Sequence, residues 1–196
     1  MEHRHSLAGP VKLWDTQRQF QIAFLKRHGL KPHHTLLDFG CGPLRGGIPI
    51  INYLEPGNYH GVDISREALD EAEKELEENK LGYKRPTLVH VKKLETLKLH
   101  KTFDFIWAFS VVIHMPDYAY EAFISFTSEH MKRNGVLYMN VNIGKRRTGG
   151  RFLSYNTYVR PLRFYNEIIS KYNLKIVDSE AAQNEIEYVE IRHEFP

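Results

Sequence analysis

The feature that most constrains this chain is a glycine-rich turn that directly follows a short apolar run. The run is Leu36–Phe39, and the glycines after it are Gly40, Gly42, Gly46 and Gly47. Because glycine has no Cβ atom, the backbone of such a turn can approach a ligand closely. An apolar run without alternation is typical of a strand that is buried on both faces. The combination therefore predicts an α/β fold with a ligand site near the turn.

A second strand is expected at Tyr59–Asp63, and it ends in an acidic side chain. Asp63 lies 21 residues beyond Gly42, and a carboxylate at that distance can bind both hydroxyls of a ribose. The pair predicts a site for a nucleoside-containing cofactor. Arg45 stands where the dinucleotide-binding pattern G-x-G-x-x-G has its third glycine, so the match to that class of protein is incomplete.

The sequences of these segments resemble motifs of a known family. LLDFGCGPLRGG at 36–47 is similar to motif I of the class I S-adenosylmethionine-dependent methyltransferases, and GVDIS at 61–65 is similar to their ribose-binding motif. Segments 103–115 and 134–139 resemble two later motifs, so the resemblance covers roughly residues 35–143 in the family's order. It implies a Rossmann-like three-layer α/β sandwich, with a mostly parallel seven-stranded sheet and an antiparallel last strand.

Periodicity and turn residues predict helices that alternate with strands, as a mostly parallel sheet requires. The expected strands are 36–39, 59–63, 87–91, 103–109, 136–141, 175–178 and 186–195, and the expected helices are 10–29, 45–54, the segment after Ser65, 118–133 and 163–172. Asp15 and Ser65 are the expected N-caps. The acidic run after Ser65 is expected to be a solvated face. Its members are Glu71, Glu73, Glu75, Glu77 and Glu78.

Size and composition favour one domain over 1–196, with 1–30 as an N-terminal helix and possible lid. The formal net charge of +3 does not argue for nucleic acid as a partner. No apolar run approaches the roughly 20 residues that span a bilayer, so no membrane association is expected. Cys41 is the only cysteine, which suits a reducing compartment, and a cytoplasmic location is expected. The oligomeric state stays open.

The resemblance implies roles for residues around the predicted cofactor, S-adenosylmethionine. Asp38, Gly40, Cys41 and Gly42 would border its methionine part, with Asp38 reaching the ammonium group, while Asp63 would bind the ribose. The remaining cofactor-binding residues that it implies are Ile64 beside the adenine, and Phe109 and Ser110 after the fourth strand. Cys41 has no acid–base partner in the sequence pattern and is interpreted as a small buried residue. No metal ligand set is predicted.

One departure from the family concerns the adenine amino group. Many members have an acid after the third strand, where this chain has Lys92-Lys93-Leu94-Glu95. Lysine cannot accept a hydrogen bond from an amine. Either a backbone group or Glu95 accepts this bond, or the adenine pocket is built differently, and Leu94 is a candidate apolar wall.

The acceptor side is less constrained by the sequence. His114 follows the fourth strand, where it is a candidate general base or, alternatively, a structural residue. Residues 142–161 are expected to form a long substrate loop, and long loops at strand ends are usually functional. Its candidates for contact with an anionic or aromatic acceptor are Tyr155, Tyr158 and Arg160. The alternative for this segment is a solvated loop.

The sequence is compatible with three functions. The first is a methyltransferase that acts on a small molecule by in-line displacement. The others are a protein that binds S-adenosylmethionine or a related nucleoside without turnover, and an RNA methyltransferase. The fourth strand ends Ala108-Phe109-Ser110-Val111 and lacks the family's N-D-S-P-P-F/Y signature for planar amino nitrogens. An oxygen, aliphatic nitrogen or carbon acceptor is therefore expected.

Overall fold

The computed structural model describes residues 2–145, 147–152, 155–181 and 186–194. These residues form two compact units that divide between Lys92 and Lys93, which we call the first and the second unit. Each unit contributes strands to a main sheet of seven strands. None of the described helices is long and apolar enough to cross a membrane.

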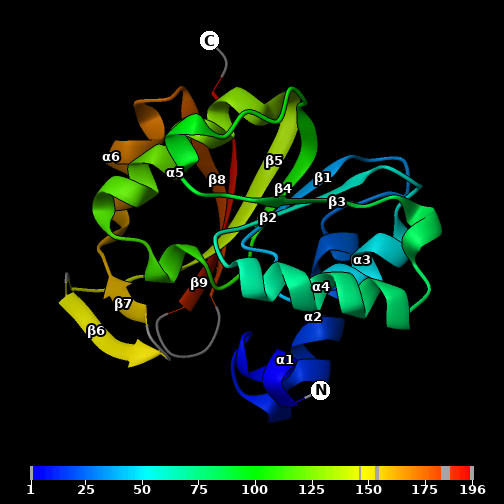
Figure 1. The fold of residues 1–196 in the computed structure, drawn as a ribbon. Coiled ribbons are helices and arrows are strands. Elements are labelled where there is room, and N and C mark those ends of the chain that lie inside the picture. Colours follow the sequence, from blue (N-terminus) through cyan, green and yellow to red (C-terminus); the bar gives the residue numbers. More distant parts are fainter. Residues whose placement is uncertain (1, 146, 153–154, 182–185, 195–196) are drawn as a thin grey trace. The chain divides into compact units, whose positions relative to one another are not determined.

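The first unit is built on three parallel strands that β2 holds together. β2 pairs in parallel with β1 and with β3, so the strands end at the same edge. The glycine turn follows β1 at that edge, and Asp63 ends β2 there. The bounds are β1 (Leu36–Phe39), β2 (Tyr59–Asp63) and β3 (Thr87–His90) for the strands, and α1 (Glu2–Ser6), α2 (Trp14–Arg27), α3 (Gly47–Tyr53) and α4 (Arg66–Glu78) for the helices (Figure 1).

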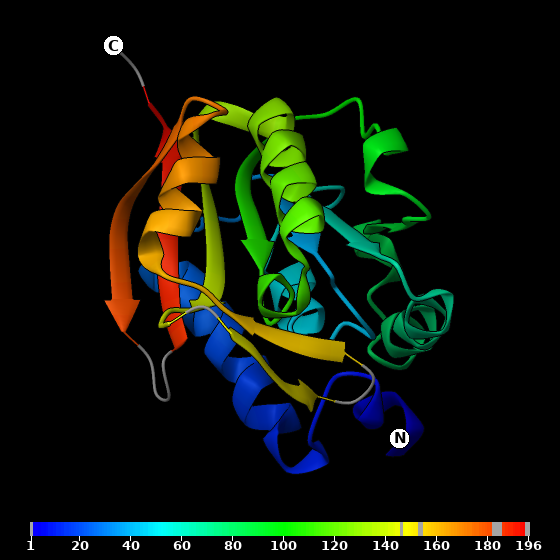
Figure 2. The same ribbon diagram turned by 90° about the vertical axis from the view of Figure 1, so that its left-hand side faces the viewer.

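The second unit has two parallel strands extended by an antiparallel pair. β5 pairs in parallel with β4, while β9 runs antiparallel to both β5 and β8. A separate two-stranded hairpin, β6 and β7, is visible in Figure 2. The bounds are β4 (Phe103–Ala108), α5 (Asp117–His130), β5 (Met131–Asn142), β6 (Arg147–Phe152), β7 (Tyr155–Val159), α6 (Leu162–Ser170), β8 (Leu174–Ala181) and β9 (Ile186–His193).

These strands confirm the expected fold class, a Rossmann-like α/β fold with a mostly parallel seven-stranded sheet and an antiparallel last strand. The apolar runs form the core as predicted, and Leu36, Leu37, Ile106 and Leu137 are fully buried. The N-cap at Ser65 is also confirmed, because its hydroxyl accepts a hydrogen bond of 3.1 Å from the Ala68 amide.

Two helix boundaries differ from the sequence prediction. α2 begins at Trp14 after a 3-10 turn at Val11–Leu13, so Asp15 lies in the first turn of the helix and not at its N-cap. α5 ends at His130, and Lys132 binds Asp104 at 2.7 Å from within β5. The helical pattern of the sequence continues through Lys132, but in the structure this residue belongs to β5 and pairs with Asp104 of the neighbouring strand.

The connection over 142–161 also differs, because most of it is regular structure. β6 and β7 pair in antiparallel fashion, with Thr148 opposite Tyr158. The pattern was hard to detect because neither strand has a clear apolar alternation.

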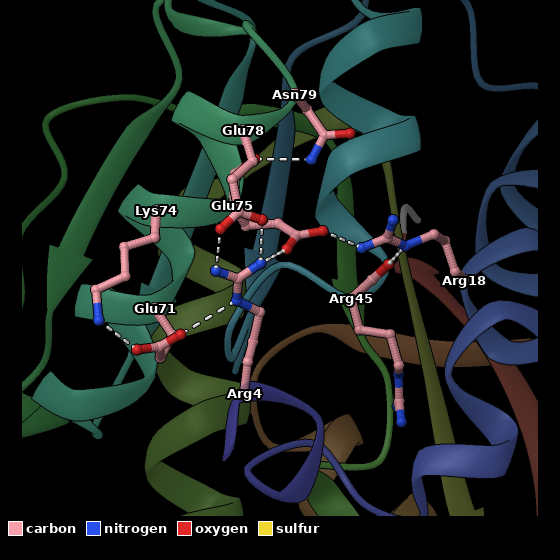
Figure 3. A network of polar contacts seen from close by, with 8 residues as sticks. All are labelled: Arg4, Arg18, Arg45, Glu71, Lys74, Glu75, Glu78 and Asn79. Carbon is pink, nitrogen blue, oxygen red and sulfur yellow. Dashed lines mark hydrogen bonds and ion pairs between the residues drawn. The ribbon is translucent and has the colours of Figure 1, made fainter. Parts of the chain in front are cut away.

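The acidic run of α4 is not wholly a solvated face. Glu75 is buried, and its carboxylate binds both Arg4 and Arg18 (Figure 3). Arg4 is itself buried and also reaches Glu71 at 3.2 Å and Glu78 at 2.7 Å. The expectation fails here because the partners of Glu75 come from segments far away in the sequence.

A matched pair of substitutions in α4 tests this network. Glu75→Gln removes a buried charge that faces two arginines, and breaking a buried ion pair from one side is strongly destabilising. Since the other glutamates still bind Arg4, we expect the free energy of unfolding to fall by about 2 kcal/mol. Glu73→Gln, at an exposed position of the same helix, should change it by less than about 0.5 kcal/mol. Urea denaturation measures both, and equal effects would contradict the burial of Glu75.

Candidate active site

The glycine turn is tied to the end of β2 by backbone hydrogen bonds. The amides of Gly40 and Cys41 both donate to the carbonyl of Val62, at 2.8 and 3.1 Å. Gly40 and Gly42 have φ angles of 75° and 54°. These left-handed conformations explain why glycine stands at both positions. The turn is thereby held against the tip of the neighbouring strand.

Asp63 links the same turn to the start of α4. Its Oδ2 accepts a hydrogen bond of 2.8 Å from the Gly42 amide, and its Oδ1 accepts one of 2.8 Å from the Ser65 amide. Burial raises the pKa of Asp63, and the hydrogen bonds from Ser65 and Gly42 oppose that rise. Both oxygens are fixed in direction, and each keeps a further lone pair that can accept a hydroxyl.

Asp38 is a buried carboxyl on β1. Its Oδ2 accepts a hydrogen bond of 2.6 Å from the Tyr59 hydroxyl on β2. Burial raises the pKa of Asp38 to about 7; the Tyr59 hydrogen bond and the charge of Arg45 lower it, while the charge of Asp63 raises it. A carboxyl with this pKa changes its protonation state near neutral pH.

Cys41 packs inside the turn. Its thiol is buried, and burial raises the pKa of this thiol well above its usual range. A Cβ atom on Gly61 would lie 2.8 Å from the Cys41 sulfur, so the opposing strand needs glycine there. A thiol that stays protonated is a poor nucleophile, which supports the interpretation of Cys41 as a packing residue.

Arg45, the residue that departs from the dinucleotide pattern, connects the turn to the N-terminal segment. Its side chain binds the carbonyl of Ala8. The carbonyl of Arg45 itself accepts a hydrogen bond of 3.1 Å from Arg18 (Figure 3). Burial lowers the pKa of Arg45 to about 10, and the charge of Asp38 opposes that change. At neutral pH the guanidinium therefore remains a cation.

Ile64, the expected neighbour of the adenine, lies directly after Asp63 with 65% of its surface exposed. An exposed large apolar side chain at this place is available to an apolar ring face. Its contact with adenine stays a prediction.

In the second unit, Phe109 and Ser110 follow β4 as expected. Phe109 stacks between Trp107 and Tyr188, with ring centroids 5.6 and 6.3 Å away. Ser110 has a φ of 58°, and its amide donates a hydrogen bond of 2.5 Å to the side chain of Asn140 on β5. Leu94, the candidate apolar wall, is half-buried in a 3-10 turn.

His114 ends a 3-10 turn at Val112–His114 in the second unit. Its Nδ1 lies 3.0 Å from the carbonyl of Asn156 on β7. Because a carbonyl only accepts, Nδ1 carries the proton and Nε2 of the neutral ring does not. Burial lowers the pKa of His114, and the bond to Asn156 opposes that change. The ring is therefore neutral at physiological pH and can accept a proton at Nε2.

The hairpin is anchored through Arg160, which is only 1% exposed. Its guanidinium donates to Asp117 at 2.9 Å and to the carbonyl of Met115 at 2.5 Å, and it lies 4.8 Å from the ring centre of Tyr158. These contacts give Arg160 an internal anchoring role that the sequence pattern did not indicate. Its expected contact with an acceptor stays a prediction, as does that of Tyr158. The side chain of Tyr155 is outside the described part of the structure.

Comparison with known proteins agrees with this arrangement. The family described as "Methyltransferase domain" matches residues 37–137, which is more than half of the chain. The chain belongs to this methyltransferase family. The membership confirms the expected class of enzyme, a methyltransferase that uses S-adenosylmethionine. No curated protein matches the chain significantly in sequence.

Solved structures with low sequence identity share the fold of this methyltransferase. Magnesium protoporphyrin IX methyltransferase (ChlM) from Synechocystis PCC 6803, with bound SAM, is 20% identical with a TM-score of 0.68, covering 90% of this chain and 78% of that one. An S-adenosylmethionine-dependent methyltransferase from Clostridium acetobutylicum ATCC 824 is 16% identical with a TM-score of 0.71, covering 94% and 92%. The glycopeptide N-methyltransferase MtfA is 13% identical with a TM-score of 0.70, covering 90% of each chain.

The sequence prediction missed one residue in each unit that holds a predicted site residue in place. Asn140 holds the Ser110 amide from the next strand, and Tyr59 holds Asp38. The register between β1 and β2 contains the signal for Tyr59. It sets Gly61 opposite Asp38, so that Tyr59 lies two residues away on the same face. That register is visible only once the strands are paired.

The pKa of Asp38 predicts how the stability of the ligand-free methyltransferase depends on pH. The native carboxyl keeps its proton up to about pH 7, whereas in the unfolded chain it ionises near pH 4. The native state therefore binds more protons than the unfolded state between these pH values. As pH rises, the free energy of unfolding falls by up to about 1.4 kcal/mol for each pH unit. Above pH 7 this decline ends.

Asp38→Asn isolates this contribution, since an amide does not ionise in this range. Urea denaturation of both proteins between about pH 5 and pH 8 should show the wild type losing stability relative to the variant. A difference between the two proteins that does not change with pH would contradict the raised pKa.

Proposed function

We propose that this methyltransferase transfers a methyl group from S-adenosylmethionine to a small-molecule acceptor, with Asp63 as the ribose ligand. The observation that carries the proposal is the placement of the Asp63 carboxylate between the Gly42 and Ser65 amides. It fixes two acceptor oxygens beside a glycine turn that permits close approach of a ligand. The structurally similar enzymes named above, a magnesium protoporphyrin IX methyltransferase and a glycopeptide N-methyltransferase, support a non-macromolecular acceptor.

The first unit supplies most of the proposed cofactor contacts. The Asp38 carboxylate accepts a hydrogen bond from the ammonium group of the methionine part. The backbone of Gly40, Cys41 and Gly42 borders that part. A cation near Asp38 favours the carboxylate form of a group whose pKa lies near neutrality. The exposed side chain of Ile64 flanks the adenine.

The proposed contacts of the second unit are Leu94 with the adenine, and Phe109 and Ser110 with the cofactor or the acceptor. Phe109 is held by its stacking on Trp107, and Ser110 by Asn140. Groups held in this way need little reordering when a ligand binds.

S-adenosylmethionine supplies a methyl group that is activated by its bond to a sulfonium. The neutral thioether that remains after transfer is a good leaving group. Proximity and alignment are therefore the main contribution of the protein, and they can be worth about 7–11 kcal/mol. An acceptor hydroxyl also needs a base, and we assign this role to Nε2 of His114. The bond from Nδ1 to Asn156 orients the ring and keeps Nε2 unprotonated.

For the acceptor we infer an anionic or aromatic compound. Residues 142–161 contain five basic and no acidic side chains, and Arg160 is the one of these five that pairs with Asp117 inside the protein. The charge of the other four favours a negatively charged ligand. Tyr155, Tyr158 and Arg160 are the proposed contacts or supports. We also retain a cytoplasmic location as a prediction, since Cys41 is the only cysteine.

Calorimetric titration with S-adenosylhomocysteine tests the cofactor site. Wild-type protein should bind with a dissociation constant near 1 μM, about 8 kcal/mol. Asp63→Ala removes both ribose acceptors and the link to Gly42, so we expect an affinity loss of at least about a hundredfold, or 2.7 kcal/mol. Asp70→Ala, an exposed aspartate on α4, is the matched control and should bind like wild type.

A well-folded wild type that binds NAD and not S-adenosylhomocysteine would overturn the cofactor assignment. Labelled methyl groups offered with small-molecule extracts or with total RNA separate the acceptor classes. Transfer to RNA alone would replace the proposed acceptor, and binding without formation of S-adenosylhomocysteine under any condition would indicate a non-catalytic binding protein.

The proposed base predicts a pH profile once an oxygen acceptor is in hand. Because the pKa of His114 lies below its usual value, kcat measured at saturating S-adenosylmethionine should fall only as pH decreases below about 6.5. His114→Gln should lower kcat by about a hundredfold or more, which is the usual contribution of a general base. Its affinity for S-adenosylhomocysteine should stay unchanged. His100→Gln, at an exposed position, is the control. If His114→Gln keeps the wild-type kcat, His114 is not the general base.

A further inference from the structure

The hydroxyl of Tyr59 occupies a closed position in the first unit. Tyr59 is only 2% exposed, and its hydroxyl donates to Oδ2 of Asp38 at 2.6 Å. A Cβ atom on Gly47 would lie 2.6 Å from the same hydroxyl oxygen, so the start of α3 is open at this point only because residue 47 is glycine. The β2 strand, the α3 start and Asp38 together fix where this hydroxyl lies.

The hydrogen bond distinguishes the two oxygens of the Asp38 carboxyl. Oδ2 is bound by Tyr59, and within the described part of the chain Oδ1 makes no hydrogen bond. Asp38 as a whole is only 4% exposed, yet Oδ1 is not among the fully buried polar atoms that lack a partner, so a ligand can reach it. A carboxylate in such a poorly solvated place gains from a cationic ligand group. The arrangement therefore leaves one oxygen available in a fixed direction.

We propose that Tyr59 is a positioning residue that holds Oδ2 of Asp38, so that Oδ1 faces the ammonium of the cofactor's amino acid part. This inference rests on the proposed function, in which Asp38 borders the methionine part. Tyr59 acts through Asp38 and does not itself touch the ligand. Its hydroxyl favours the ionised form of Asp38, which is the form that binds a cation.

The groups around Asp38 have opposing effects on its ionisation, so the hydrogen bond from Tyr59 can influence which form is present. Burial and the neighbouring carboxylate of Asp63 favour the neutral acid, whereas Arg45 and the Tyr59 hydroxyl favour the carboxylate. The thiol of Cys41 lies in the same environment and stays protonated. With the carboxyl balanced near neutral pH, loss of one hydrogen bond shifts the balance toward the form that does not bind an ammonium.

Two ligands separate this role from a general effect on the site. S-adenosylhomocysteine carries the ammonium, whereas 5′-methylthioadenosine keeps the nucleoside and the sulfur but lacks the amino acid part. Tyr59→Phe should weaken the first about tenfold at pH 7 and change the second by less than about twofold. Tyr53→Phe is the matched control, because its hydroxyl donates to the Leu30 carbonyl at 3.1 Å and does not contact Asp38. Calorimetry measures both ligands with the wild type and with each of the two variants, which makes six titrations.

The pH dependence supplies a second readout. Wild-type affinity for S-adenosylhomocysteine should rise between about pH 6 and pH 8, as Asp38 ionises, and the same rise in Tyr59→Phe should occur at higher pH. Affinity for 5′-methylthioadenosine should show neither effect. In an Asp38→Asn background, Tyr59→Phe should produce no further loss, which keeps the test decisive if the single variant is less stable.

Equal weakening of both ligands, or unchanged binding of S-adenosylhomocysteine, would overturn the role of Tyr59 while leaving the proposed function in place. Failure of the wild type to bind either ligand would instead remove the proposed cofactor site, and the Tyr59 assignment with it.

Discussion

The first unit depends on one carboxylate at the end of a strand. Asp63 joins the glycine turn after β1 to the start of α4, because its two oxygens accept amides from Gly42 and Ser65. Without it the turn would lose the side chain that fixes the Gly42 amide, and α4 would lose a partner for one of its first backbone amides. The same two bonds orient the oxygens toward which a ribose would bind, so structure and proposed binding share one group.

Desolvation sets the electrostatic behaviour around that carboxylate. Asp38 and Asp63 are both raised in pKa by burial, while the pKa of Arg45 is lowered to about 10 by the same cause. In a medium of low polarity, each of these charges is stabilised mainly by the few groups that contact it. This is why a single hydrogen bond, such as that from Tyr59 to Asp38, can influence the protonation state of a group proposed to bind the cofactor.

The sequence predicted features that depend on neighbouring residues. The strands at 36–39 and 59–63, the glycine turn and the cap at Ser65 all follow from local pattern, and the structure has them. Glu75 and Tyr59 could not be assigned in this way. The partners of Glu75 are Arg4 and Arg18, and that of Tyr59 is fixed by strand register. Such contacts depend on how distant segments pack, which residue type and spacing do not encode.

The same distinction explains why the acceptor is harder to derive than the cofactor. The proposed cofactor contacts of the first unit lie on a turn and strand ends whose lettering a whole family shares. The hairpin of the second unit is instead held by long-range bonds, from His114 to Asn156 and from Arg160 to Asp117. Because the Arg160 charge is neutralised inside the protein, it adds little to the field outside. If the acceptor is anionic, as we propose, its selection would then rest on the other basic residues of 142–161, while the buried arginine anchors the hairpin.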